Sequence, residues 1–114
     1  IDPNYANSYY NLGVVLQELG EHQKAKDCYE KAIKIDPNYA NSYYNLGVVL
    51  QESGDLQKAL SCYEKAIELD PLNKEYMVTY GHILLSLNDN LKGYEYITKG
   101  EGAIKFTPSY YKVI

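Results

Sequence analysis

The sequence IDPNYANSYYNLGVVLQE fills residues 1–18 and returns, letter for letter, at residues 35–52. The repetition extends further, because residues 1–34 and 35–68 differ at six positions only, which are 19, 21, 22, 26, 27 and 34 of the first copy. A third, degenerate copy begins at Leu69. A fixed period of this length predicts stacked supersecondary units, each too small to bury its own apolar face.

Each copy predicts two helices. The first runs from about Ala6 to Leu19, and its apolar residues at steps of three and four form one stripe. That stripe consists of Tyr9, Leu12, Leu16 and Leu19. Gly20 follows, where a helix end favours a residue that tolerates positive φ. The second helix runs from about Gln23 to Ile35, and Asn38 is predicted to cap the helix after it.

One glycine recurs inside the first helix of each copy, as Gly13, Gly47 and Gly81. A glycine inside a helix costs about 1 kcal/mol relative to alanine, so its repetition at constant spacing needs a reason. Small residues let helices approach closely, which leaves room for large side chains such as Tyr29 around them. The glycines are therefore predicted to be packing positions.

The pattern Tyr9-x2-Leu12-Gly13-x2-Leu16, followed by Gly20, Ala25, Tyr29, Ala32 and Pro37, resembles the tetratricopeptide repeat (TPR). The resemblance covers residues 1–102 as three units, 1–34, 35–68 and 69–102, of which the third is degenerate. It implies an all-α fold, a right-handed α-solenoid of about three helix-turn-helix units. In such a solenoid the first helices line a concave groove that binds extended peptides or partner helices. Residues 103–114 are expected to form a C-terminal cap or a junction.

A second face of each first helix is polar and aromatic, and the resemblance places it in the groove. Its residues are Asn7, Tyr10, Asn11, Val14 and Glu18 in the first copy, Asn41, Tyr44, Asn45, Val48 and Glu52 in the second, and His82 in the third. An asparagine amide both donates and accepts, which suits it to a peptide backbone. Tyrosine offers flat apolar area with a polar tip. Peptide contact and support of the neighbouring helix both remain open as roles for the asparagines.

Two variants of the family bear on this groove. Chaperone-binding TPR domains hold a C-terminal carboxylate with a clamp of Lys, Asn and Arg, but at the corresponding positions only Asn45 matches and Glu75 has the wrong charge. A carboxylate clamp is thus disfavoured. The stretch YYNLGVVLQE is similar to the superhelical repeats of O-linked N-acetylglucosamine transferases, where a ladder of asparagines matching Asn11 and Asn45 holds substrate peptides.

The composition and the spacing of reactive residues exclude several classes of partner and activity. The net charge is −4 and no basic stripe occurs, which argues against a nucleic-acid partner. No apolar run approaches the ~20 residues of a membrane span, so no membrane partner is expected. His22, His82 and the two cysteines match no metal-ligand spacing, and no phosphate-binding loop or activated nucleophile is found. We therefore expect no enzyme activity, no cofactor and no metal.

Cys28 and Cys62 lie one repeat apart. Equivalent positions on stacked helices are too distant for a disulfide, so both are expected to be free, buried thiols. Free thiols suggest a reducing compartment, and a cytoplasmic or nuclear location is the expectation. The chain begins with Ile inside the repeated phrase, from which we expect a piece of a longer protein.

Three functions remain in view. The first is a scaffold that binds a protein or peptide partner in the groove. The second is the substrate-binding arm of a larger enzyme such as a glycosyltransferase. The third is a structural spacer or self-stacking unit, because the first helix lacks a cap and near-identical repeats could stack weakly head to tail between molecules.

Overall fold

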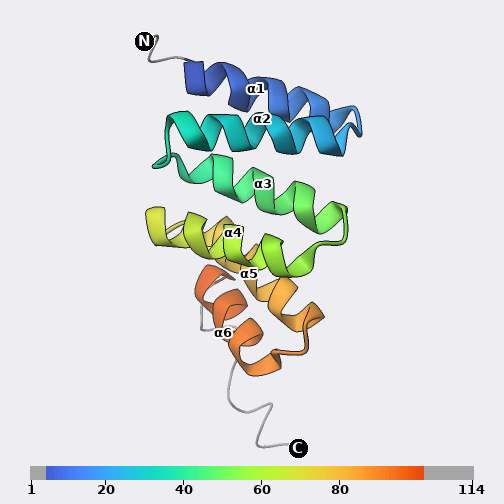
Figure 1. Ribbon diagram of the computed structural model, residues 1–114. Coiled ribbons are helices and arrows are strands. Elements are labelled where there is room, and N and C mark those ends of the chain that lie inside the picture. Colours follow the sequence, from blue (N-terminus) through green and yellow to red (C-terminus); the bar gives the residue numbers. More distant parts are fainter. Residues whose placement is uncertain (1–4, 102–114) are drawn as a thin grey trace, which may run out of the picture. The chain divides into compact units, whose positions relative to one another are not determined.

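The computed structural model describes residues 5–101, which form six helices and contain no strand. The helices are α1 (Tyr5–Glu18), α2 (His22–Ile35), α3 (Ala40–Glu52), α4 (Leu56–Leu69), α5 (Lys74–Ser86) and α6 (Asn90–Glu101), as Figure 1 shows. This confirms the all-α fold and places the predicted helix bounds within about a residue. The predicted cap at 103–114 lies outside the described residues.

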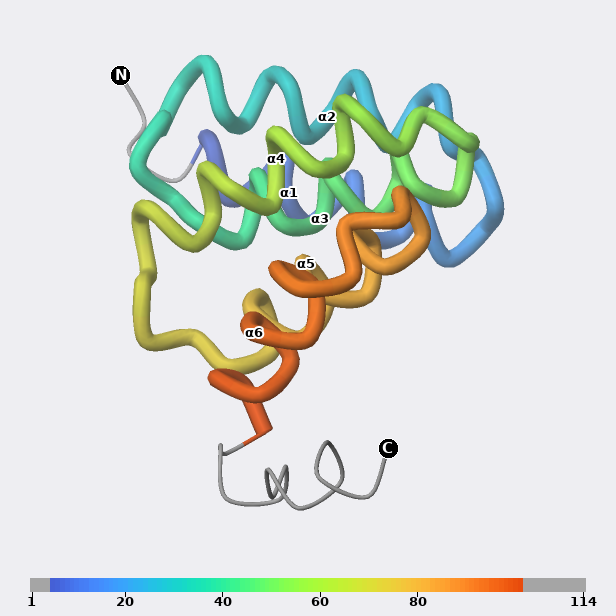
Figure 2. The backbone as a smooth tube through the Cα atoms, turned by 90° about the horizontal axis from the view of Figure 1, so that it is seen from below, coloured from blue at the N-terminus to red at the C-terminus, as the bar shows by residue number. Residues whose placement is uncertain are grey.

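The chain divides into two compact units, Ile1–Pro71 with α1 to α4 and Leu72–Ile114 with α5 and α6. In the first unit, α1 packs on α2, α2 on α3, and α3 on α4. Figure 2 shows α1 and α3 in one layer of this unit and α2 and α4 in the other. In the second unit, α5 packs on α6.

The turns after α1, α3 and α5 share one backbone feature at equivalent positions. Gly20 and Gly54 have φ angles of +79° and +89°, as the helix-end prediction requires. The third turn uses Asn88, with φ of 68°, at the position 34 residues after Gly54. Asparagine is the residue that replaces glycine most readily in the left-handed region, and this equivalence was not anticipated.

The predicted cap at Asn38 is wrong. The residue that precedes α3 is Tyr39, and its side chain makes no capping hydrogen bond. The backbone N–H of Asn38 instead donates to Oδ1 of Asp36 at 3.2 Å, which forms part of the turn between α2 and α3. Side-chain caps occur at Asp55, which accepts from the Lys58 N–H, and at Asn73, which accepts from the Tyr76 N–H.

The helical glycines lie where the paired helix comes closest. A Cβ on Gly13 would be 2.7 Å from Cε1 of Tyr29, and one on Gly47 would be 2.6 Å from Cε1 of Tyr63. Both tyrosine rings are fully buried, and each hydroxyl donates to a glutamine of the facing helix at 2.7 Å, Gln17 in one case and Gln51 in the other. The packing role predicted for these glycines is confirmed.

In the second unit, different residues fill the contact between the two helices. Ile97 and Leu85 stand where Tyr63 and Gln51 stand one repeat earlier, so an apolar pair replaces the hydrogen-bonded pair. A Cβ on Gly81 would be 2.6 Å from the carbonyl oxygen of Gly93, which means that the two backbones nearly touch. Glycine at 93, where the other copies have alanine, permits this approach.

The predicted apolar stripe of the first helix is core in one copy only. In α3 the equivalents of the stripe, Leu46 and Leu50, are buried. In α1, Leu12 is exposed although the helices share the sequence ANSYYNLGVVLQE. The difference follows from the neighbours, since α3 has α2 packed against it and, among the described residues, no preceding helix covers α1 in this way.

Candidate functional site

We call the polar and aromatic residues predicted for the groove in α1 and α3 the amide face. It comprises Asn7, Tyr10, Asn11, Val14 and Glu18 of α1 with Asn41, Tyr44, Asn45, Val48 and Glu52 of α3. All ten side chains are exposed or half-buried, so none of them is buried in the core. The two helices lie in the same layer of the first unit, which brings the two halves of this face together.

One hydrogen bond joins the halves of the amide face. Nδ2 of Asn45 donates to the hydroxyl of Tyr10 at 3.0 Å, across 35 residues of sequence. Burial raises the pKa of the Tyr10 hydroxyl above its usual value, and the hydrogen bond from Asn45 offsets part of this. The supporting role considered for the asparagines therefore exists at Asn45. The Asn45 amide also interacts with the Tyr29 hydroxyl, where it offsets part of the rise in pKa that burial causes.

The tyrosines of the amide face are anchored to rings behind them. The Tyr10 ring has its centroid 5.2 Å from that of Tyr39 in an edge-to-face arrangement and 5.9 Å from that of Tyr29. The Tyr44 ring lies 5.5 Å from the buried Tyr63 ring. Such ring pairs hold the side chains in place, so a partner that contacts Tyr10 or Tyr44 meets a rigid surface. Tyr39 was not among the predicted site residues.

The asparagines nearest the start of the chain are the accessible ones. Asn7 and Asn11 are exposed, whereas Asn41 and Asn45 are half-buried. Glu52 is exposed, and its Oε1 lies 3.4 Å from Nε2 of His22 on α2. The pair ties the end of α3 to the start of α2, which makes Glu52 partly structural.

His82 belongs to the second unit and is described there by itself. It is exposed on α5, one and two turns from the half-buried Thr79 and the exposed Glu75. Its predicted place in the groove stays a prediction.

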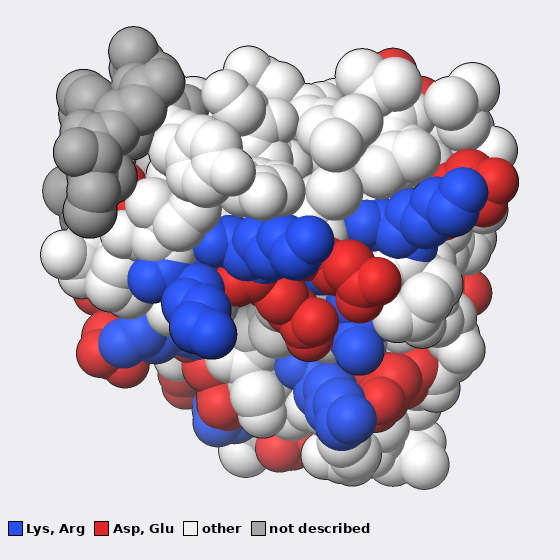
Figure 3. All heavy atoms as spheres, turned by 45° about the horizontal axis from the view of Figure 1, so that its top comes forward, with Lys and Arg blue, Asp and Glu red and all other residues white. Residues whose placement is uncertain are grey.

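The outer side of α2 carries charges of both signs. A pocket there is lined by Asp27, Glu30, Lys31 and Lys34, and Lys26 pairs with Glu30 at 3.6 Å. Figure 3 shows acidic and basic side chains mixed in one band, beside a stretch of surface that carries neither. Mixed charges of this kind solubilise a surface and do not form a phosphate-binding stripe.

The chemistry available to the described residues is limited. Within residues 5–101 no three His, Cys, Asp or Glu side chains come together as metal ligands, and no helix has the length and apolar character for a membrane crossing. Both cysteines are free, but Cys62 is only half-buried, which corrects the expectation that both are buried. Burial raises the pKa of the Cys62 thiol to about 11, so it stays protonated and is a poor nucleophile.

The geometry can be compared with known proteins. The family profile described as tetratricopeptide repeat matches residues 6–39 and 40–73. A crystal structure of MamA is 29% identical with a TM-score of 0.82, covering 92% of this chain and 64% of MamA. Another MamA structure is 30% identical with a TM-score of 0.80, covering 87% of this chain and 54% of MamA. PilF of Pseudomonas aeruginosa is 27% identical with a TM-score of 0.77, covering 85% of this chain and 44% of PilF. The comparison with curated proteins gave no match.

Proposed function

Because the chain belongs to the tetratricopeptide repeat family, we propose that it is a non-catalytic module that binds an extended peptide or a helix along the amide face. The general role in protein interaction follows from the family. The specific surface is our proposal, as is the assignment of residues 69–102 to a third repeat. Gly81 and the pairing of α5 with α6 support that assignment.

The observation that carries the proposal is the repetition of the amide face. Two consecutive repeats present an asparagine, a tyrosine and a second asparagine at the same register, on adjacent helices of one layer. Amides spaced along such a surface can pair with peptide groups at intervals along a bound chain, regardless of its side chains. The Asn45–Tyr10 bond and the anchored rings order this surface before binding, which lowers the entropy cost.

The test starts with capture of a partner by the 114-residue chain and mapping of the captured segment to a synthetic peptide. Asn11→Ala is expected to weaken binding of that peptide about 2- to 10-fold, the equivalent of one hydrogen bond, and to leave the melting temperature unchanged because Asn11 is exposed. Asn45→Ala is expected to lower both stability and affinity. Gln57→Ala is the matched control, since Gln57 is an exposed amide on α4.

Unchanged affinity in Asn11→Ala together with lost stability in Asn45→Ala would show that the asparagines only support the helix stack. That outcome would overturn the proposed binding surface. Labelled peptide and fluorescence polarisation give the affinities, and thermal unfolding gives the stabilities.

A second candidate function is that of an assembly unit, through weak head-to-tail self-association. Apolar residues of α1 are exposed although their equivalents in α3 are buried, and this favours self-association. A cytoplasmic or nuclear location also stays a proposal, supported by the two free thiols.

A further inference from the structure

Asn45 of α3 makes hydrogen bonds to both helices of the preceding repeat. Its Nδ2 donates to the hydroxyl oxygen of Tyr10 on α1 at 3.0 Å, and its amide also bonds the hydroxyl of Tyr29 on α2. Because Tyr29 donates its only hydroxyl proton to Oε1 of Gln17 at 2.7 Å, its oxygen can only accept from Asn45. Both bonds of the Asn45 side chain therefore use N–H groups of Nδ2.

These two bonds fix the orientation of the Asn45 amide. Tyr29 is fully buried, and its ring centroid lies 5.9 Å from that of Tyr10, so both accepting hydroxyls are held in place. If the amide turned over, it would lose both hydrogen bonds. The polar atom that neither bond uses is Oδ1 of Asn45, which is an acceptor. Beside it, Tyr10 accepts through its oxygen, and this bond leaves its O–H proton for another partner.

An acceptor beside a donor matches one residue of an extended peptide. In an antiparallel strand pair, the N–H and the C=O of the same residue point to one side and bond the same partner. Backbone N–H groups inside an α-helix are already bonded to a carbonyl four residues earlier, and proline has no N–H at all. An extended segment with a residue other than proline is therefore the partner that fits.

We propose that Asn45 and Tyr10 form a subsite for one residue of an extended peptide. Oδ1 of Asn45 accepts from the N–H of that residue, and the Tyr10 hydroxyl donates to its C=O. Tyr29 is a positioning residue, because it acts on the peptide through Asn45. The proposal rests on peptide binding by the amide face and deepens it, since it makes the partner an extended segment and not a helix.

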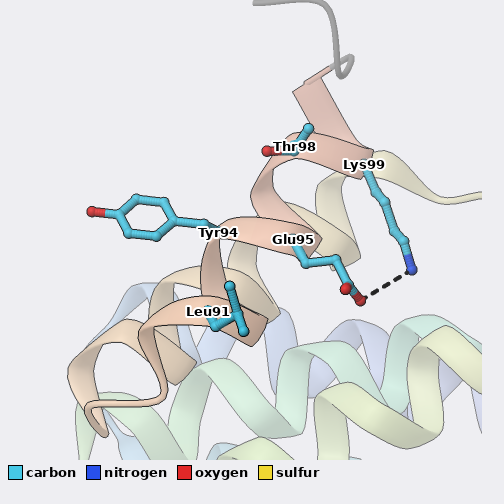
Figure 4. A pocket seen from close by; sticks show the side chains of 5 residues that line it. All are labelled: Leu91, Tyr94, Glu95, Thr98 and Lys99. Atoms are coloured by element: carbon cyan, nitrogen blue, oxygen red, sulfur yellow. Dashed lines mark hydrogen bonds and ion pairs between the residues drawn. The ribbon is translucent and has the colours of Figure 1, made fainter. Parts of the chain in front are cut away.

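The pocket on α6 differs from this subsite in the chemistry of its lining, which consists of Leu91, Tyr94, Glu95, Thr98 and Lys99. Figure 4 shows Glu95 and Lys99 pointing toward each other, with Nζ of Lys99 3.5 Å from Oε1 of Glu95, while Tyr94 extends away from them. A peptide group there would meet an exposed ion pair. Tyr94, which is 49% exposed, therefore serves as the control tyrosine outside the amide face.

The probe for the test comes from a random peptide library displayed on phage and selected on the 114-residue chain. Its members are about twelve residues long, which is roughly 40 Å when extended. The tightest selected peptide is synthesised with each amide in turn replaced by an ester, which puts an oxygen in place of the N–H. Fluorescence polarisation then gives the affinity of each peptide for wild type, Asn45→Ala, Tyr10→Phe and the control Tyr94→Phe.

At one peptide position, the ester is expected to weaken binding to wild type and to Tyr94→Phe about 2- to 10-fold, the equivalent of one hydrogen bond. The same ester should have little effect on binding to Asn45→Ala, because the acceptor is already missing. Tyr10→Phe should bind the all-amide peptide more weakly and show a smaller ester effect, because the Asn45 amide is no longer held. Selected peptides are expected to lack proline at that position.

The orientation of the amide can be measured without a peptide. In wild type, the side-chain N–H protons of Asn45 are expected to exchange with water more slowly than those of Gln57, an exposed amide on α4. Tyr10→Phe should speed the exchange at Asn45, whereas Tyr94→Phe should leave it unchanged. Equal exchange at Asn45 and Gln57 in wild type would overturn the positioning by the two tyrosines.

The remaining results separate this subsite from the proposed function. If Asn11→Ala and Asn45→Ala weaken binding but no ester distinguishes wild type from Asn45→Ala, the amide face binds peptides and the subsite is wrong. A selected peptide that is helical when bound would also overturn the subsite alone. If the library yields no peptide whose binding depends on Asn11 or Asn45, the proposed function and the subsite both fail.

Discussion

Gly47→Ala is expected to lower the free energy of unfolding by about 1–2 kcal/mol, although alanine is the better helix former. A Cβ at this position would lie 2.6 Å from Cε1 and 2.9 Å from Cδ1 of Tyr63. The ring cannot move aside at low cost, because Tyr63 is fully buried and its hydroxyl donates to Gln51 at 2.7 Å. Either the two helices separate or the ring leaves its preferred rotamer.

The magnitude is the difference of two opposing effects. Inserting a methyl group into a close-packed contact costs roughly 1–3 kcal/mol, and the short distances here place this contact at the upper end. The gain in helix propensity from glycine to alanine is about 1 kcal/mol. Urea unfolding followed by circular dichroism measures the net change as a lower midpoint with an unchanged slope. Thermal unfolding should show a fall of about 4–8 °C for each kcal/mol lost.

A double-mutant cycle with Tyr63→Leu separates the two effects. When the ring is absent, Gly47→Ala is expected to be neutral or stabilising, so the two substitutions should couple strongly. If Gly47→Ala stabilises the wild-type chain as much as it stabilises Tyr63→Leu, the ring contact does not limit this position and the reasoning is refuted.

Three further predictions concern stability. Ser42→Ala is expected to raise the free energy of unfolding by about 1 kcal/mol, because the buried Ser42 hydroxyl has no hydrogen-bond partner within residues 5–101, whereas Ser8→Ala at the equivalent exposed position should change it little in the same urea assay. Asn88→Gly is expected to raise the melting temperature by the equivalent of about 0.5 kcal/mol, because glycine adopts the φ of 68° without strain, and a fall would contradict this. Burial raises the pKa of Tyr29 from 10.0 to about 12, which means that the folded state favours the neutral hydroxyl. The contribution of this hydroxyl to the free energy of unfolding is therefore fully present below pH 10 and is lost as the pH rises toward 12. A Tyr29→Phe variant that loses stability over that window as steeply as wild type, in alkaline titrations followed by circular dichroism, would contradict the assignment.

The 34-residue period was sufficient to predict the order and approximate bounds of the helices. The sequence features that determine the local structure recur in the first two copies. They are apolar residues at steps of three and four, a glycine where φ turns positive, and a glycine against which a tyrosine packs. Helix capping was less predictable, because several polar residues near Asn38 compete for the same turn.

Burial could not be inferred from the letters, because Leu12 and Leu46 occupy identical local sequences and differ in exposure. Local sequence sets which way a side chain points on its helix, but whether water reaches it depends on which other helix lies beside it. The Asn45–Tyr10 bond is of the same kind, since it requires two residues 35 positions apart to meet. Periodicity therefore decided the helices and their pairing, while the arrangement of neighbours decided which copies of the same residues are core and which are surface.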